Sequence, residues 1–471
     1  MRGRLPALVA MIVWLPVGAG CARYVARPIA PARAAARLEA RRLSDPGVTN
    51  ALRAQDATRP TPAVAWTLGT LTTAALYFSP ALGVARADWS VAQAGVVTAG
   101  ARPNPDLAVD VAAITHGGTP SPSLLSTLLD WPVVTAGKRG LAVAEARAHS
   151  LAQRWRVQSV AWEVRRDVRD AALAVWEAEQ AVDRSTTEVD TETTLVQFVQ
   201  RRLAVGEISA LALGEQQLAL ARTRAALSTD RTRLASARAG LAGAVGIPIE
   251  ALDSVRLSLE AFGGPLPEPP PPIEARATAL LTRSDLQAAL ADYAAAQEAL
   301  QLEIARQYPD VTIGAGLHWE RELGGLTVTP ALPLAILNRN RGPIAAADAK
   351  REASAARFTQ LQAAAMSAVD RAGAEYAASR RALAAADSVA AQEQTLAGRA
   401  DALVRAGASD RVTLLEATLA VLSARRNQLA ARTQAWTALG ALESALQRPL
   451  IGGGWTMPAI GADSTGRRAT P

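Results

Sequence analysis

Apolar and polar residues alternate with a period of two in four short stretches of the chain. The clearest stretch is residues 310–321, and a second, residues 326–336, follows it after a pair of glycines. Such alternation is typical of strands with one apolar face, and two strands joined by a short glycine turn form a hairpin. Residues 106–116 show the same pattern, and residues 124–134 show it less cleanly. We predict four strands, whose apolar faces carry Leu107, Val109, Val111, Val311, Ile313, Ala315, Leu317, Trp319, Leu326, Val328 and Leu332.

Long helices are predicted for most of the remaining chain. Residues 139–203 contain no proline and no glycine after Gly140, so an unbroken helix there would be on the order of 95 Å long. The segments that follow carry an apolar residue at every seventh position, which is the spacing of a coiled-coil seam. These positions are Leu213, Leu220, Leu227, Leu234 and Leu241 in the first half, and Leu415, Leu422, Leu429 and Trp436 in the second. Two antiparallel helical hairpins are therefore expected.

The chain is an internal duplication. A proline-rich stretch at residues 263–272 separates two halves that match at an offset of 204 near their beginnings and 201 further on. Because fixed self-similarity determines an architecture, we predict two repeats, residues 64–262 and 273–450. Each has a helix, two strands and two long helices, which makes the fold mainly α with a small β part. Matching pairs include Trp89 with Tyr293, Asp106 with Asp310, Gly206 with Gly407, and Glu215 with Glu416.

The two ends of the chain differ from the repeats. Residues 1–20 have basic residues followed by a short apolar run, which is typical of an export signal. Cys21 comes directly after small residues, as in the lipobox of bacterial lipoproteins, and is a candidate lipidation site; the alternative is an ordinary signal peptide cleaved nearby. We expect residues 21–63 to be extended and residues 451–471 to form a disordered tail.

Composition excludes several classes of function. The chain is 49% hydrophobic but only 4% aromatic, and its net charge of +7 is spread along helical faces and not gathered in one block, which argues against nucleic-acid binding. The three histidines have no metal-ligand spacing, and no glycine-rich phosphate loop precedes a helix. We therefore predict no enzyme activity, no catalytic residue, no metal and no cofactor.

Four amphipathic strands in an exported chain raise the question of how the sheet closes. An open sheet leaves backbone groups unpaired at its edges, and lipid offers these groups no partner. Two copies of the chain would supply eight strands around a filled interior, whereas three copies would supply twelve around an open lumen. We predict an obligate oligomer; the alternative is a small soluble sheet packed on helices.

The duplication and three local stretches together resemble the TolC family of outer-membrane efflux channels over about residues 64–450. The stretches are "SPALGVARADWSVAQAGVVTAGARPNPDL", "PLAILNRNRGPIAAADA" and the two glycine-containing helix breaks. The resemblance implies a homotrimer in the outer membrane, with a twelve-stranded β-barrel in lipid and a helical tunnel in the periplasm. It also implies a periplasmic adaptor and an inner-membrane pump of the RND or a similar type. The alternatives are the exit duct of a type I protein secretion system and, in a different class, a periplasmic coiled-coil adaptor or scaffold.

The same resemblance suggests three groups of functional residues. The helix breaks would be the periplasmic tips where an adaptor docks, with Asp410 standing where the family usually has serine. Acidic and polar residues after the breaks would narrow the aperture, and the segment after the last strand would form the strand-to-helix junction. The tip residues are Val205, Gly206, Glu207, Ile208, Ser209, Ala406, Gly407, Ala408, Ser409 and Asp410; the aperture residues are Glu215, Thr413 and Glu416, with Ala212 matching Thr413; the junction residues are Asn338, Arg339, Asn340 and Gly342.

Overall fold

The structure is a computed structural model that describes residues 24–55, 65–116, 119–320 and 323–451. Residues 1–20 and Cys21 lie outside these ranges. The chain divides into two compact units, residues 1–41 and 42–471. The helix described in the first unit is α2 (Pro31–Glu39), and all other described elements belong to the second.

Two helices occupy the region that was expected to be extended. These are α2 and α3 (Pro46–Gln55), and each begins at a proline, whose fixed φ suits the first turn of a helix. The carboxylate of Asp45 accepts a hydrogen bond of 2.8 Å from the backbone of Gly47, and α3 buries Val48 and Leu52. The expectation of an extended segment is therefore wrong for these residues.

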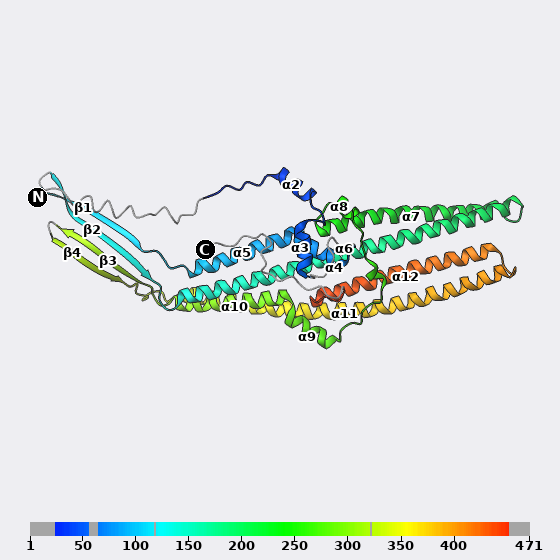
Figure 1. The fold of residues 1–471 in the computed structure, drawn as a ribbon. Helices are drawn as coiled ribbons and strands as arrows, with labels where there is room; N and C mark the ends of the chain where they lie inside the picture. Colours follow the sequence, from blue (N-terminus) through cyan, green and yellow to red (C-terminus); the bar gives the residue numbers. More distant parts are fainter. Residues whose placement is uncertain (1–23, 56–64, 117–118, 321–322, 452–471) are drawn as a thin grey trace. The chain divides into compact units, whose positions relative to one another are not determined.

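The second unit contains two copies of one order of elements (Figure 1). The first copy is α4 (Leu68–Phe78), α5 (Pro80–Gly100), β1 (Asp106–His116), β2 (Thr119–Val133), α6 (Lys138–Ala204) and α7 (Ala210–Val245). The second copy is α9 (Pro272–Thr282), α10 (Ser284–Ala305), β3 (Val311–Glu320), β4 (Leu323–Ala331), α11 (Arg341–Arg405) and α12 (Arg411–Leu446). Short α8 (Ile249–Asp253) and the 3₁₀ turn η1 (Glu260–Gly263) connect them.

The long helices pack in pairs. Helix α6 packs antiparallel against α7, and α11 against α12, and α6 also contacts α5, α10 and α12 (Figure 1). Alanine and leucine dominate these helices, and small side chains allow close approach of the helix axes. The fold predicted from the pattern, mainly helical with long paired helices and four strands, is confirmed.

The four strands form one antiparallel sheet in the order β1-β2-β3-β4. The structure extends β2 toward the chain's start, to Thr119, because its first residues pair with the end of β1. It also ends β4 at Ala331, earlier than the predicted residue 336. Pro333 follows and has no N–H to donate to a neighbouring strand, so the ladder stops before it.

The register places apolar side chains on one face across all four strands. Directly paired residues point to the same side of a sheet, and Ile313 pairs with both Trp131 and Pro330. The next row on this face joins Leu107, Leu129, Ala315 and Val328. Nine large apolar side chains of this face are exposed in the single chain: Leu107, Val109, Leu129, Trp131, Ile313, Leu317, Trp319, Leu326 and Val328. The other face carries Asp106, Asp110, Ser126, Asp130, Thr312, His318, Thr327 and Thr329.

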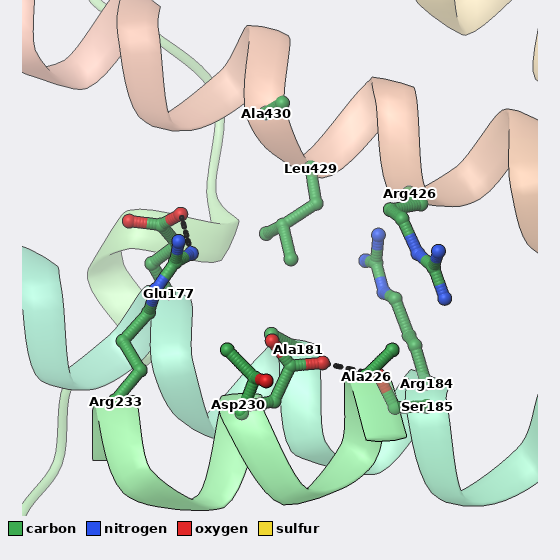
Figure 2. Close-up of a pocket in the computed structure, with 11 residues that line it drawn as sticks. Glu177, Ala181, Arg184, Ser185, Ala226, Asp230, Arg233, Arg426, Leu429 and Ala430 are labelled. Atoms are coloured by element: carbon green, nitrogen blue, oxygen red, sulfur yellow. Dashed lines mark hydrogen bonds and ion pairs between the residues drawn. The ribbon is translucent and has the colours of Figure 1, made fainter. Parts of the chain in front are cut away.

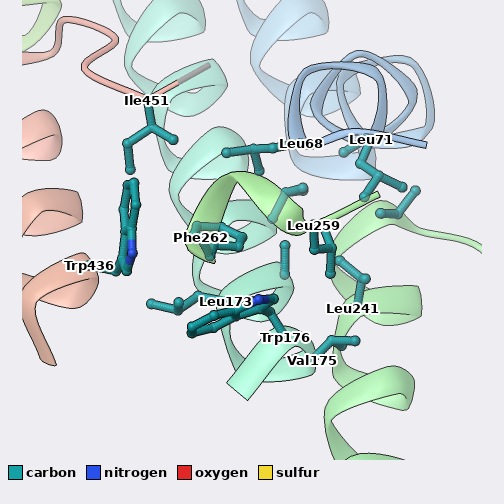
Figure 3. Close-up of a cluster of buried hydrophobic side chains, with 14 of the residues drawn as sticks. Leu68, Leu71, Leu173, Val175, Trp176, Leu241, Leu259, Phe262, Trp436 and Ile451 are labelled. Carbon is teal, nitrogen blue, oxygen red and sulfur yellow. The ribbon is translucent and has the colours of Figure 1, made fainter. Parts of the chain in front are cut away.

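A hydrophobic core lies where the middle of α6 meets α4, α7 and α12. Trp176 and Trp436 lie on either side of Phe262, with ring centroids 6.1 and 5.4 Å from the phenylalanine (Figure 3). Tyr376 is also fully buried here, and its hydroxyl donates a 2.5 Å hydrogen bond to the carbonyl of Pro267 in the proline-rich stretch. Each large side chain buried in this way contributes about 1.5–3 kcal/mol. The core therefore joins both repeats and the segment between them.

A buried ion cluster joins α6 to the end of α12. The carboxylate of Glu443 accepts hydrogen bonds from Arg165 at 2.9 Å and from the backbone of Leu450 and Ile451 at 2.8 and 3.0 Å. Arg165 and Glu443 are each 1% exposed, and Arg169 adds a second positive charge 3.5 Å from the carboxylate. Ile451 is buried and held in place, so the predicted disordered tail does not begin at this residue; residues 452–471 lie outside the described ranges.

Helices α4 and α5 are separated by a sharp bend at Ser79. The Ser79 hydroxyl accepts a 3.2 Å hydrogen bond from Leu82, and Pro80 follows it in the first turn of α5. Within the described ranges, no helix taken singly has both the length and the apolar content needed to cross a membrane. The pair α4 and α5, bent by 52°, reaches those values only together.

Candidate functional site

The first hairpin turn lies between α6 and α7. Gly206 adopts the left-handed conformation, with φ of 77°, and the backbone of Glu207 donates a 2.9 Å hydrogen bond to the carbonyl of Arg202. The Ser209 hydroxyl then accepts a 3.2 Å hydrogen bond from the backbone of Ala212 and so caps α7. Val205 is 71% exposed at this turn.

The second turn, between α11 and α12, has the same backbone. Gly407 has φ of 72°, and Ala408 donates a 2.9 Å hydrogen bond to the carbonyl of Leu403. Asp410 caps α12: its Oδ1 accepts hydrogen bonds from the backbone and hydroxyl of Thr413 at 2.9 and 2.8 Å. The backbone hydrogen bond from Thr413 is the main cause of a lowered pKa at Asp410. The carboxylate therefore stays charged at neutral pH.

Two contacts join the hairpin turns to each other. The guanidinium of Arg202 binds Glu207 in its own turn and Oδ2 of Asp410 in the other, both at 3.0 Å. The guanidinium carbons of Arg201 on α6 and Arg411 on α12 also lie 4.4 and 5.1 Å from the centroid of the Phe198 ring. Such contacts between cations and aromatic rings are favourable. The two tips of one chain are thus adjacent and linked.

The predicted aperture residues lie just beyond these turns. Glu215 on α7 and Glu416 on α12 are exposed and each lies six residues after its cap residue. Thr413 is exposed as well, but its hydroxyl is already bonded to Asp410. Ala212 serves the first cap through its backbone N–H.

The predicted junction residues lie between β4 and α11. Asn338 accepts a 3.0 Å hydrogen bond from the backbone of Asn340, which adopts a left-handed conformation with φ of 57°. The Asn340 side chain does not cap α11; its amide donates to the carbonyl and carboxylate of Glu303 at the end of α10, both at 2.8 Å. Arg339 and Gly342 are exposed.

The junction between β2 and α6 is held in a similar way. Asp310, just before β3, accepts hydrogen bonds of 2.8 Å from the backbone of Thr135 and from Nζ of Lys138. The Thr135 hydroxyl donates a 2.7 Å hydrogen bond to the carbonyl of Pro309. Both strand-to-helix junctions are therefore fastened to the segment that leads from α10 into β3.

A cavity of about 420 Å³ lies between α6, α7 and α12. Among the residues that line it, Arg233 pairs with Glu177 at 3.4 Å, and the Ser185 hydroxyl donates a hydrogen bond to Asp230 (Figure 2). Burial, followed by the charge of Arg425, lowers the pKa of Arg184 beside it. Within the described residues, no three His, Cys, Asp or Glu side chains come together in a group suited to a metal ion.

The comparison with protein families identifies the family to which this chain belongs. The model for "Outer membrane efflux protein" matches residues 71–247 and 276–447, which are the two repeats and make up most of the chain. The chain belongs to the outer membrane efflux protein family. The resemblance to the TolC family that was inferred from the sequence is confirmed. A search of curated proteins found no significant match to the chain.

Solved structures of outer-membrane channels share this fold. The outer-membrane channel OprN is 21% identical, with a TM-score of 0.66 over 80% of this chain and 89% of its own. VceC of Vibrio cholerae is 19% identical, with a TM-score of 0.65 over 80% and 95%. The open state of the MtrE channel of Neisseria gonorrhoeae is 17% identical, with a TM-score of 0.67 over 81% and 89%.

This outer membrane efflux protein is therefore an efflux channel of the outer membrane that extends into the periplasm, and it is not an enzyme. Sequence reasoning located both hairpin turns but missed the contacts between them. The aspartate at position 410, where the family usually has serine, is the sequence feature that could have indicated this contact. A carboxylate has two oxygens, so it caps α12 with one and binds Arg202 with the other.

Proposed function

We propose that three copies of this chain form a closed conduit across the outer membrane, joined in the periplasm to an adaptor and an inner-membrane pump of the RND or a similar type. The sheet supports this proposal most strongly. It has four strands, an exposed apolar face, and, among the described strands, no partner for the outer edges of β1 and β4. Three copies supply the twelve strands that close such a sheet around an open lumen. The apolar face would contact lipid.

The hairpin tips are the proposed adaptor-docking surface, which consists of residues 205–209 and 406–410. The turns expose short side chains and one large apolar residue, Val205, beside the carboxylates of Glu207 and Asp410. The contact of Arg202 with Asp410 places the two turns side by side, so that one partner can contact both. Docking of this kind fits a passive channel, because the pump would supply the energy.

A charge at position 205 tests this docking surface. Val205→Glu places a carboxylate where an apolar contact is proposed, so binding of the adaptor is expected to weaken about tenfold or more. Export should fall, while the amount of channel in the outer membrane and its conductance in bilayers stay unchanged. Val205→Leu, which keeps the apolar contact, is the control and should export normally. Normal export by Val205→Glu would contradict docking at this surface.

Glu215 and Glu416 are the proposed aperture residues. In a trimer these two positions would supply six carboxylates near one axis, and a ring of like charge favours cations. The proposal expects cation preference in planar bilayers to fall in the double variant Glu215→Gln and Glu416→Gln. Unchanged ion selectivity in that variant would count against it.

Cys21 is the proposed lipid anchor, on the strength of the small residues before it and the export-type segment at residues 1–20. An acyl chain at this position would fix the first residues of the mature protein to the membrane surface. The intact mass of the purified protein tests this. Cys21→Ser should lose the mass of the lipid, and equal acylation of both proteins would refute the assignment.

A further inference from the structure

The segment between β4 and α11 exposes an unusual run of large apolar side chains. Leu332, Leu334, Ile336 and Leu337 are 52%, 71%, 71% and 100% exposed. Soluble surfaces seldom expose contiguous apolar side chains of this size without a partner that covers them. The segment cannot pair as a strand, because Pro333 lacks an N–H and the backbone of Ile336 bonds locally to the carbonyl of Leu334 at 2.8 Å.

Two arginines follow within four residues of Leu337. Arg339 and Arg341 are exposed, and neither forms an ion pair with another described residue. The residue between them is fixed, because the Asn340 side chain is bonded to Glu303 on α10. The two guanidinium groups therefore extend from an anchored point of the backbone.

The nearby acidic groups are either paired with other cations or lie on the other face of the sheet. Asp310 pairs with Lys138 at 2.8 Å, and Glu303 pairs with Arg306 at the end of α10. The carboxylates of Asp106 and Asp130 lie on the polar face of the sheet, opposite the apolar face. An excess of positive charge consequently remains on Arg339 and Arg341, and the exposed Arg139 at the start of α6 adds to it.

The apolar run continues the apolar face of the sheet. Ala331, the last residue of β4, pairs with Thr312, which in turn pairs with Pro132, so the segment leaves the sheet at the level where β2 ends and β3 begins. Exposed Trp131 lies at the same level on the apolar face. Aliphatic side chains favour the hydrocarbon, whereas tryptophan and arginine favour the membrane–water interface and the headgroups, so the three residue types occur together at the boundary of a bilayer.

We propose that residues 332–341 bind an anionic phospholipid of the periplasmic leaflet, with the aliphatic side chains among its acyl chains and Arg339 and Arg341 on its phosphate. Guanidinium groups form paired hydrogen bonds with phosphate oxygens and suit this ligand better than a lysine does. The inference relies on the proposed position of the sheet in the bilayer. It makes the segment a lipid-binding site at the point where the barrel meets the tunnel.

Competition between two brominated lipids tests the site. The full-length protein is reconstituted in phosphatidylcholine vesicles that contain brominated phosphatidylglycerol or, in a parallel series, brominated phosphatidylcholine, and tryptophan quenching is measured. The wild-type protein is expected to prefer the anionic lipid by about fivefold for each arginine. Arg339→Gln with Arg341→Gln should lose this preference, and Arg339→Lys with Arg341→Lys should keep part of it.

The control variant removes the same number of positive charges at a distant part of α11. Arg381 and Arg399 are exposed on α11, away from the sheet, so Arg381→Gln with Arg399→Gln should keep the wild-type lipid preference. Comparison of Trp131→Phe with the wild-type protein gives the part of the fluorescence quenching that comes from Trp131. Inorganic phosphate added to the vesicles should leave the quenching unchanged.

Several outcomes would overturn the proposal. Equal quenching by both lipids in a membrane-embedded wild-type protein would refute the proposed lipid site without contradicting the proposed channel function. Displacement by inorganic phosphate would mean that the arginines bind free anions. Dissociation of the oligomer in the Arg339 and Arg341 variant, with lipid preference retained, would mean that a second copy of the chain covers the segment. A wild-type protein that salt alone washes from the vesicles would instead refute the proposed function.

Discussion

Glu192 on α6 is a carboxylate in an unfavourable environment. It is 8% exposed, and its Oε2 has no hydrogen-bond partner among the described residues. Burial, together with the charge of Glu188, raises its pKa above the usual value. Because the folded protein holds the charged form less well than the unfolded chain does, Glu192 lowers stability at neutral pH. This penalty is absent below the unfolded pKa of about 4.3 and is complete above the raised folded pKa.

Removing this charge should stabilise the protein in a pH-dependent way. Glu192→Gln is expected to raise the free energy of unfolding at neutral pH by on the order of 1 kcal/mol, because a neutral acceptor is less costly to bury unsatisfied than a charged one. The advantage should shrink as the pH falls from neutral through the raised pKa of Glu192 to the unfolded value of about 4.3. Thermal unfolding followed by circular dichroism at both pH values checks this. A constant difference between the two proteins would show that Glu192 does not titrate as argued.

Individual residues of the buried ion cluster could not be predicted from the sequence. Arg165 and Glu443 are separated by 278 positions, and both occur in helices with many exposed charges of the same types. Nothing local distinguishes a buried arginine from a solvated one. The pairing follows from tertiary packing, which brings α6 against the end of α12.

At the scale of elements, periodicity and glycine placement predicted most of the fold. The long helices and both hairpin turns follow from local residue types, because glycine accepts a positive φ and serine or aspartate then caps the next helix. The end of β4 was placed too late, since alternation of side chains continues to Leu332 although Pro333 ends the backbone ladder. The alternation of apolar and polar residues indicates to which face of the sheet the side chains point. It does not indicate where the backbone hydrogen bonds between strands end.

The glycine at the first turn and a glycine in the helix after it should respond in opposite ways to alanine. Gly206 has φ of 77°, so Gly206→Ala is expected to destabilise the hairpin by about 1–2 kcal/mol. Gly214 lies within α7 and has open space where the Cβ of an alanine would lie, so Gly214→Ala should stabilise by about 0.5–1 kcal/mol. The unfolding temperatures of the two variants decide this. Destabilisation by both would mean that a contact in the assembled channel, and not backbone conformation, sets the requirement for glycine.

At the scale of the whole molecule, the sequence predicted that a single chain does not form a complete structure. One chain offers a sheet with an apolar face and two free edges among its described strands, and two helical hairpins whose tips contact each other. The contact between the tips depends on Arg202 and Arg411, which no sequence pattern identified, because both are ordinary charged residues until the hairpins are placed side by side. The membership of the chain in the outer membrane efflux protein family supports the proposal that lipid covers this apolar face and that other copies complete the edges.

Single-channel conductance of the purified full-length protein in planar lipid bilayers tests this account most directly. If three chains close a barrel around an open lumen, insertion should produce discrete and uniform conductance steps. The protein should insert into the bilayer when the detergent is diluted away. Its molecular mass measured in detergent should be that of a trimer. A correctly folded protein that remains monomeric and produces no conductance steps would contradict the central claim.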